Sequence, residues 1–556
     1  MKASAKPKIR TVAPAVLDDY DILDDEINTW LAALERKTDQ VIFVSDSCHS
    51  GTVTRNEDAP MSRGIPIDTR PHPLGTATFK SSPLTCVRIS ACQANEKAVE
   101  YPEAPKTHGL FTWFWAQALK EARPGETWDD LHKRVSARLR MENGRQHPQI
   151  EGKSQRLIFK GGFAELQKTI PVRYVYPKTP KAKIGAGRLL GVTRGSVYQK
   201  YDAKAQNQNS AVITITKVGT TWSEGDVQGT FVTGDLVTLK RYKPAAPPLK
   251  VFIAADLVKD RPLVERIKAA VAELPMFAVT PHQEQCKYVL RILRPKQTDG
   301  KYIYARPDDS APRTCTGQPP QCWVMTSGEG LVHKDLITAM RDADKGIKVL
   351  CENLEKMGRL YNLTTLTSAP GPDSPVQFDA EVWRKADPGT QAQTLKADNR
   401  TWQKEQTVKS TELAQADLRA GRMLTFTLRN NTDRPYYTYL VNMTDRGEII
   451  PFYPPAYLNS ESGLLPPGGV RHIEEVTLFI ETPGREYIRL IASLKPIDIF
   501  LLTQDGYRQG IKTRSEGLNP LEMLLVTKAG HTRSRVGELS ERTAWSTMQG
   551  AFEIKP

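Results

Sequence analysis

The 556-residue sequence has no long hydrophobic run, and no apolar stretch approaches the roughly 18 residues of a membrane-spanning helix. Residues 1–14 are basic and have no apolar core, so we expect no signal peptide in the chain as given. Cysteine is sparse, with seven residues and no Cys-x-x-Cys pair of the kind that binds metals. We therefore expect neither a membrane span nor a cysteine-bound metal, and the compartment is not predicted.

Blocks of like charge are also missing. Lys and Arg exceed Asp and Glu by 14, with a pI near 9.3, but they are scattered along the chain. No RNA- or DNA-binding motif accompanies them, so we interpret the excess as solvated surface and expect no nucleic-acid partner. Hydrophobic residues make up 39% of the sequence, which is enough for packed cores. A chain of this length is expected to hold several domains.

A candidate nucleophile follows the first clear strand. Val41 to Val44 is a short apolar run, typical of a buried strand in a parallel sheet. The run stops at small and polar residues, and reactive groups lie just beyond the carboxyl ends of such strands. Cys48 lies there, with Asp46 two residues before it, and could act as a nucleophile. The ordinary alternative for a lone cysteine is a small buried hydrophobe.

A second strand of the same kind ends near Ser90 and Cys92 and is followed by acid and amide groups that include Glu96. Two such strand ends, side by side, can build a pocket wall beside a nucleophile. We expect the two strands to be adjacent and parallel, with Cys48 at their carboxyl end.

Four strings of residues occur in a characteristic order: Asp46 to Gly51, Ile89 to Gln93, Gly109 to Thr112 and His147 to Gly152. Together they resemble the caspase-like peptidases of family C14, especially bacterial metacaspase relatives, over roughly residues 1–162. The resemblance implies an α/β sheet-and-helix domain and a cysteine endopeptidase with a His–Cys dyad. It also implies that Cys48 is the nucleophile and that the Cys48 amide belongs to the oxyanion hole.

The resemblance implies a substrate pocket as well, for a protein or peptide. Metacaspase relatives prefer Arg or Lys because acids line that pocket, and Asp46 matches one such acid. The second acid would fall at Ala94, and Glu96 is the candidate replacement. Ser90 and Cys92 lie at the same strand end and are expected to bind substrate with them.

Histidine is missing where the family needs it. The dyad histidine lies upstream of the cysteine, but no histidine precedes His49 in this chain. His49 is the neighbour of Cys48, so on an extended segment it points to the opposite side. We expect His108, at a helix start, to be structural. The domain is therefore expected to be incomplete at its N-terminus and the chain as given to be inactive, and a non-catalytic scaffold is the alternative function.

Two loops near the nucleophile have open interpretations. The acidic cluster 18–21 suits calcium, on which metacaspase relatives often depend, but we favour a solvated acidic turn and expect no cofactor. The polar, Pro-rich loop 51–83 contains arginines, as a self-cleavage site of a basic-specific protease would. A plain flexible loop is the alternative.

Amphipathic patterns predict helices from Asp24, over 110–122 and over 128–141. The first should pack on the sheet through the face formed by Ile27, Trp30, Leu31 and Leu34. An apolar run predicts a short strand over 157–159.

Three further domains are expected after the caspase-like one. The predicted units are 1–162, the incomplete caspase-like domain; 171–245, a small β-barrel; 249–367, a small α/β module; and 405–530, a β-sandwich-like domain. The Pro- and Lys-rich stretch 171–183 is expected to be a linker. The last unit resembles an uncharacterised β-domain often appended to bacterial caspase-like proteins, and its partner is not predicted.

Overall fold

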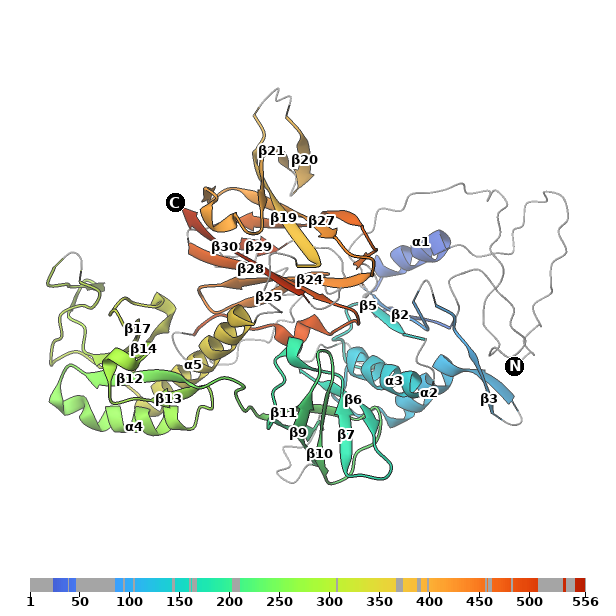
Figure 1. Ribbon diagram of the computed structural model, residues 1–556, viewed down its shortest axis with the longest axis horizontal. Coiled ribbons are helices and arrows are strands. Elements are labelled where there is room, and N and C mark those ends of the chain that lie inside the picture. Colours follow the sequence, from blue (N-terminus) through green and yellow to red (C-terminus); the bar gives the residue numbers. More distant parts are fainter. Residues whose placement is uncertain are drawn as a thin grey trace.

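The chain folds into several bodies built around separate sheets (Figure 1). The computed structural model describes residues 24–38, 40–46, 86–93, 96–103, 106–142, 146–159, 162, 168–202, 211–306, 309–366, 374–387, 392–397, 400–455, 458, 463–481, 484–508, 534–536 and 546–555. Among the helices within these ranges, none combines the length and the apolar character that crossing a bilayer requires.

The N-terminal sheet has three strands in the described part of the chain: β1 (Ile42–Ser45), β2 (Val87–Ser90) and β5 (Gln149–Gly152). β1 and β2 are parallel neighbours, as predicted, and β5 runs antiparallel to β2. The expectation that β1 is buried on both faces is wrong, since Val44 is 39% exposed. Within the described ranges β1 lies at the edge of this sheet, where it is incompletely covered.

Three helices accompany this sheet, and all three were predicted: α1 (Asp24–Glu35), α2 (Leu110–Glu121) and α3 (Trp128–Glu142). The hairpin of β3 (Glu100–Glu103) and β4 (Lys106–Gly109) leads into α2. α2 and α3 pack against β2 in one apolar core, which includes Ile89, Phe111 and Leu131. This core holds the end of β2 in a fixed position relative to the start of α2.

Two local expectations for this region are wrong. Of the predicted packing face of α1, Leu31 is buried, but Trp30 and Leu34 are 51% and 47% exposed, so the face is covered only in part. Residues 157–159 form no strand. The preceding segment binds the start of α3, where the Trp128 N–H donates to the Arg156 carbonyl at 3.1 Å. Only an isolated bridge joins Leu157 to Thr127.

A closed six-stranded barrel follows, as predicted, with strands in the order β10-β7-β6-β11-β8-β9. Its strands are β6 (Ile170–Val175), β7 (Lys181–Ile184), β8 (Val197–Lys200), β9 (Val212–Val218), β10 (Ser223–Gln228) and β11 (Leu236–Arg241). The stretch 171–183 is therefore not a linker. Alternate residues such as Val172 and Ala182 point into the barrel core and are fully buried, which makes the segment a hairpin despite its prolines.

The α/β module has a five-stranded mixed sheet in the order β13-β12-β14-β17-β18. Its elements are β12 (Leu249–Ala255), α4 (Arg261–Ala272), β13 (Phe277–Val279), β14 (Tyr288–Leu293), β17 (Gln321–Thr326), β18 (Ile337–Ala339) and α5 (Ala343–Thr365). Both helices share one core with the sheet, because each presents an apolar stripe to it.

Two six-stranded sheets make up the C-terminal part and share one hydrophobic core. The first contains β19 (Val376–Lys385), β20 (Thr394–Ala397), β21 (Arg400–Lys409), β23 (Met423–Asn430), β27 (Val470–Ile480) and β29 (Ser534–Val536). The second contains β22 (Leu418–Arg419), β24 (Tyr436–Thr444), β25 (Ile449–Tyr453), β26 (Leu464–Leu465), β28 (Gly484–Ser493) and β30 (Ser546–Lys555). These sheets extend beyond the predicted limits 405–530. β19 lies before residue 405, and β30 lies after residue 530 and pairs with β28.

A buried lysine on α3 joins the N-terminal part to the C-terminal part. Lys133 Nζ lies 2.9 Å from a carboxylate oxygen of Asp129 and 2.9 Å from one of Asp498, and it donates to the Thr169 carbonyl at 3.2 Å. Burial by itself would lower the pKa of Lys133, but the two carboxylates outweigh it and hold the pKa above its usual value. The lysine therefore stays charged and links α3, the start of the barrel and the segment that follows β28.

Replacing Lys133 with methionine is expected to destabilise this junction by about 2 kcal/mol, because two partly buried carboxylates lose their cation. Differential scanning calorimetry of the full chain would show a lower first transition. Lys268→Met is the matched control, because Lys268 pairs with Glu265 on the exposed surface of α4 and its loss should cost about 0.5 kcal/mol or less. Equal shifts for both variants would contradict a role for Lys133 at the junction.

Candidate active site

The polar residues that the sequence singled out lie where β1 and β2 end and β5 begins. This end of the N-terminal sheet is called the sheet edge below. Ser45 lies opposite Ser90, and Ser90 lies opposite Gln149. Because β5 is antiparallel, the residues just before Gln149 emerge at the same edge as those just after Ser45 and Ser90. Asp46, the loop after β2 and His147 therefore meet there.

Asp46 is half-buried and follows β1 directly. The hydroxyl of Thr112, in the first turn of α2, donates to Asp46 Oδ2. Thr112 is exposed, so this contact lies on the solvent side of the edge. The contact connects the end of β1, which precedes Cys48 in the sequence, to α2, the helix that packs against β2.

Ser90 and Cys92 shape the turn after β2. The Ser90 hydroxyl donates to the Cys92 carbonyl at 3.4 Å. The Cys92 side chain is 1% exposed and packs in the core with Leu110 and Phe111. Its sulfur lies 3.6 Å from the Glu96 carbonyl oxygen. A substrate at this edge would meet the backbone of Cys92 and not its thiol, whereas half-buried Ser90 stays a candidate contact.

Glu96 is engaged by groups of the protein itself. Its Oε2 accepts the N–H of Gln93 at 3.2 Å and the N–H of His147 at 2.7 Å, and its Oε1 contacts Nδ1 of the His147 ring. The Glu96 and His147 side chains are 13% and 25% exposed. The Glu96 carboxylate thus connects the loop after β2 to the segment before β5. This is a structural role, different from binding a basic side chain of the substrate.

We expect Glu96→Ala to lower kcat/KM for arginyl and neutral peptides by similar factors, roughly tenfold. Without the carboxylate, buried donors of Gln93 and His147 lose their acceptor, at a cost of about 1–3 kcal/mol each. Glu96→Gln keeps one acceptor oxygen and should be milder on both peptides and on the melting temperature. A loss confined to arginyl peptides would instead show that Glu96 reads the substrate.

Three residues at this edge received no role from the sequence: Thr112, Gln146 and His147. Gln146 is fully buried, donating to the Ala91 carbonyl at 3.0 Å and accepting the Val99 N–H at 3.2 Å. Thr112 and His147 belong to the strings that carry the family resemblance, which was the available indication. Their partners lie 66 and 51 positions away in the sequence, so local patterns could not supply them.

Several predicted positions lie outside the described residues: Cys48, the loop 51–83, Ala94 and the acidic cluster 18–21. Cys86 precedes β2 and so lies at the opposite end of that strand from Ser90. It is fully buried, and burial together with a hydrogen bond to the Glu35 carboxylate raises the pKa of its thiol to about 11. Cys86 is therefore protonated at neutral pH and is no rival nucleophile. The His108 ring stacks on Trp113, with ring centroids 5.5 Å apart.

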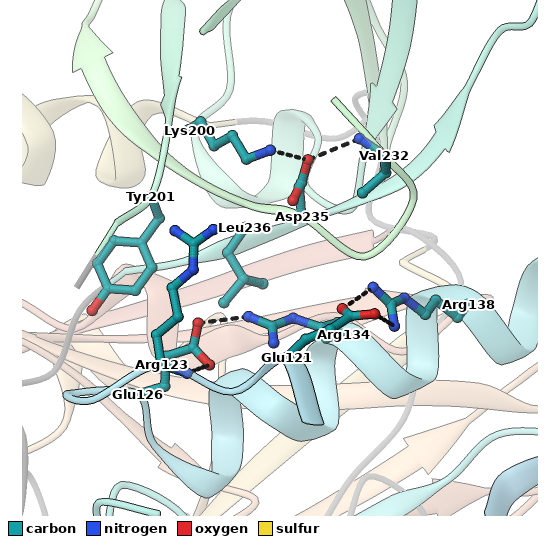
Figure 2. Close-up of a pocket in the computed structure, with 10 residues that line it drawn as sticks. All are labelled: Glu121, Arg123, Glu126, Arg134, Arg138, Lys200, Tyr201, Val232, Asp235 and Leu236. Carbon is teal, nitrogen blue, oxygen red and sulfur yellow. Dashed lines mark hydrogen bonds and ion pairs between the residues drawn. The ribbon is translucent and has the colours of Figure 1, made fainter. Parts of the chain in front are cut away.

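A separate cavity of about 420 Å³ lies between α2, α3 and the barrel (Figure 2). Its lining residues are Glu121, Arg123, Glu126, Arg134, Arg138, Lys200, Tyr201, Val232, Asp235 and Leu236. Arg134 pairs with Glu126 at 2.6 Å and Lys200 with Asp235 at 2.7 Å, and Arg138 pairs with Glu121. The cavity lies at the end of α2 remote from Thr112, about 14 Å along the helix. We interpret the cavity as part of a charged interface between the helices α2 and α3 and the barrel, distinct from the sheet edge.

The comparisons with known proteins bear on the first part of the chain. Residues 19–159 match a family model described as the caspase domain of the peptidase C14 type. The matched segment includes all four strings that carry the resemblance and ends before the barrel begins. No curated protein and no solved structure matches the chain.

Proposed function

We propose that this chain is a cysteine endopeptidase with Cys48 as its nucleophile, because residues 19–159 match the caspase-domain model of the peptidase C14 type. The observation that supports the proposal is the convergence of Asp46, the loop after β2 and His147 at the carboxyl edge of β1 and β2. Cys48 follows Asp46 by two residues in the sequence. A nucleophile at the end of one parallel strand, with a polar wall at the end of the next, suits attack on a bound peptide.

In the proposed mechanism the thiolate of Cys48 attacks the scissile carbonyl carbon and forms a tetrahedral intermediate. The Cys48 amide donates to the oxyanion. Collapse of the intermediate expels the amine, which takes a proton from the general acid, and leaves an acyl-enzyme. Water then adds to the acyl carbon, and the carboxylate product and free thiol are released.

The proposed dyad needs a histidine as its proton acceptor, and no histidine precedes His49 in this sequence. His147 lies at the same edge but on the far side of β2. Two strand spacings separate β1 from β5, about 9–10 Å, and a general base needs hydrogen-bond contact with its nucleophile. Its Nδ1 is already held by Glu96. We assign His147 to the wall of the pocket.

The proposed specificity is for Arg or Lys before the scissile bond. Asp46 carries this proposal, because the Glu96 carboxylate is occupied by Gln93 and His147. Thr112 supports Asp46 by donating to one of its oxygens. A single acid that is half removed from water can recognise a cationic side chain, because its desolvation is compensated when that cation binds.

The test is active-site labelling of the chain extended upstream to include its histidine. A peptidyl-arginyl acyloxymethyl ketone should attach to Cys48, as peptide mapping by mass spectrometry would show, and the Cys48→Ala variant should remain unlabelled. An aspartyl ketone of the same length is the matched control and should label far more slowly. Labelling at other cysteines with Cys48 untouched would refute the proposal.

A non-catalytic scaffold is the second candidate function. It is favoured by the lack of any histidine before His49 and by the extent of the chain outside the matched segment. An upstream coding sequence with a Gly-His-Gly-like motif after alternating apolar strands would support the enzyme. A stop codon at that position would support the scaffold.

A further inference from the structure

The barrel concentrates the positive charge of the chain. Residues 170–241, from the start of β6 to the end of β11, hold eleven Lys and Arg and four Asp and Glu, a net charge of +7. That is half of the +14 carried by all 556 residues. The charges are spaced along the sequence, but closure of the six strands brings those of the described residues onto one small body.

One row of side chains crosses four neighbouring strands of this barrel. Tyr174 on β6 lies opposite Lys183 on β7, Lys183 opposite Glu224 on β10, and Glu224 opposite Lys217 on β9. Ala182 and Ile184, on either side of Lys183, face the core, and because side chains alternate along a strand, Lys183 and its cross-strand partners lie on the outer face of the barrel. On β6 the register shifts between Val172 and Tyr174, so Tyr174 is exposed on the same outer face although Val172 is buried in the core.

Aromatic rings are interleaved with the lysines of this face. The Trp222 ring has Lys183 Nζ at 4.5 Å and Lys217 Nζ at 5.5 Å from its centroid. The ring also packs against Gly219, where a Cβ atom would come within 2.6 Å of it, so its position is restricted. Tyr174 is 36% exposed and contacts Tyr176 edge-on at a centroid distance of 4.9 Å. Rings and cations are therefore interleaved on this outer face.

The acids of this face are already engaged with other groups, which leaves Lys183 and Lys217 without an ion-pair partner within the described residues. Glu224 accepts a hydrogen bond from the Tyr176 hydroxyl at 2.6 Å, and Asp226 pairs with Lys181 at 3.3 Å. The contact of Lys183 and Lys217 with the Trp222 ring is a weak interaction that an anion can replace.

We propose that this outer face, formed by β6, β7, β10 and β9, binds single-stranded nucleic acid. The lysines would contact successive phosphates, and Tyr174 and Trp222 would stack on unpaired bases. A duplex fits less well, because its bases are already stacked and the face offers no helix to enter a groove. This differs from the expectation drawn from the sequence, which judged the basic residues to be scattered.

The experiment measures binding of a fluorescein-labelled 20-mer of oligothymidylate to the full chain by fluorescence anisotropy, at 50 and 200 mM salt. The double variant Lys183→Gln and Lys217→Gln should weaken binding at least tenfold and reduce the slope of log affinity against log salt by about 1.4. Tyr174→Ala should weaken binding about fivefold or more through lost stacking, with little change in that slope.

The matched control is Lys268→Gln with Lys348→Gln, which removes the same charge from a partly exposed position on α4 and an exposed one on α5. It should change affinity less than twofold. Equal weakening by both double variants would overturn the proposal, because only net charge would then matter. Competition by duplex DNA or heparin as effective as by unlabelled oligothymidylate would overturn it too. Circular dichroism and melting of each variant confirm that a loss of binding is not a loss of the barrel.

Discussion

Replacing Cys48 with alanine is expected to lower kcat/KM for arginyl peptides by about three orders of magnitude or more, in a chain that carries its upstream histidine. The chain as printed should show no turnover of such peptides. A thiol without a basic partner has a pKa of about 8.5 and is mostly protonated at pH 7, and no partner would protonate the leaving amine. Fluorogenic arginyl, lysyl and aspartyl peptides provide the measurement.

Cys315→Ala is the matched control, because Cys315 is a free and partly exposed thiol far from the sheet edge in sequence. It should leave turnover unchanged. Turnover by the printed chain that disappears on Cys48→Ala would contradict the assignment of the base. In that case His147, the histidine that the structure describes at this edge, would become the residue to replace next.

The second large effect concerns Asp46. Asp46→Ala should lower kcat/KM for arginyl peptides by roughly two orders of magnitude, about 3 kcal/mol, while neutral peptides change much less. The arginine side chain would lose its partner carboxylate in a partly desolvated pocket, whereas a neutral side chain makes no such pair. Parallel kinetics on matched arginyl and neutral peptides, with the extended chain, provide the test.

Two further variants distinguish binding of the substrate by Asp46 from a structural role of Asp46 in the loop before Cys48. Asp46→Asn keeps an oxygen for the Thr112 hydroxyl but removes the charge, so it should resemble Asp46→Ala on arginyl peptides. Thr112→Val removes the supporting hydroxyl and leaves the charge, so its effect should be several-fold and alike on both substrates. Equal losses on both substrates for Asp46→Asn would show that Asp46 only supports the loop before Cys48.

Part of the fold was predictable because it rests on local periodicity. The apolar runs at Val41 and Val87 each stop at small polar residues, and this pattern was sufficient to predict two parallel strands with a polar edge. The apolar stripes of α2 and α3 gave their ranges within a residue or two. Alternating residues between glycines indicated the barrel. Each of these patterns repeats within a few residues and needs no knowledge of a distant partner.

The stretch 171–183 shows where composition misleads. Its prolines and lysines are typical of a linker, yet Val172 and Ala182 alternate with outward residues and close the barrel. Likewise Trp30 and Leu34 share a helical face with Leu31, but only Leu31 is buried. Periodicity tells which residues share a face, whereas burial depends on what lies opposite that face.

By itself, the sequence determined the candidate nucleophile, the parallel strand pair, the helices α2 and α3 and the presence of a barrel, since these depend on local composition and spacing. Only the tertiary structure decided that Glu96 clasps His147, that Thr112 supports Asp46 and that Lys183 and Lys217 flank Trp222. Each of these contacts joins different strands or helices. The relative register and packing of those elements depend on the whole core, and no local pattern in the chain records them.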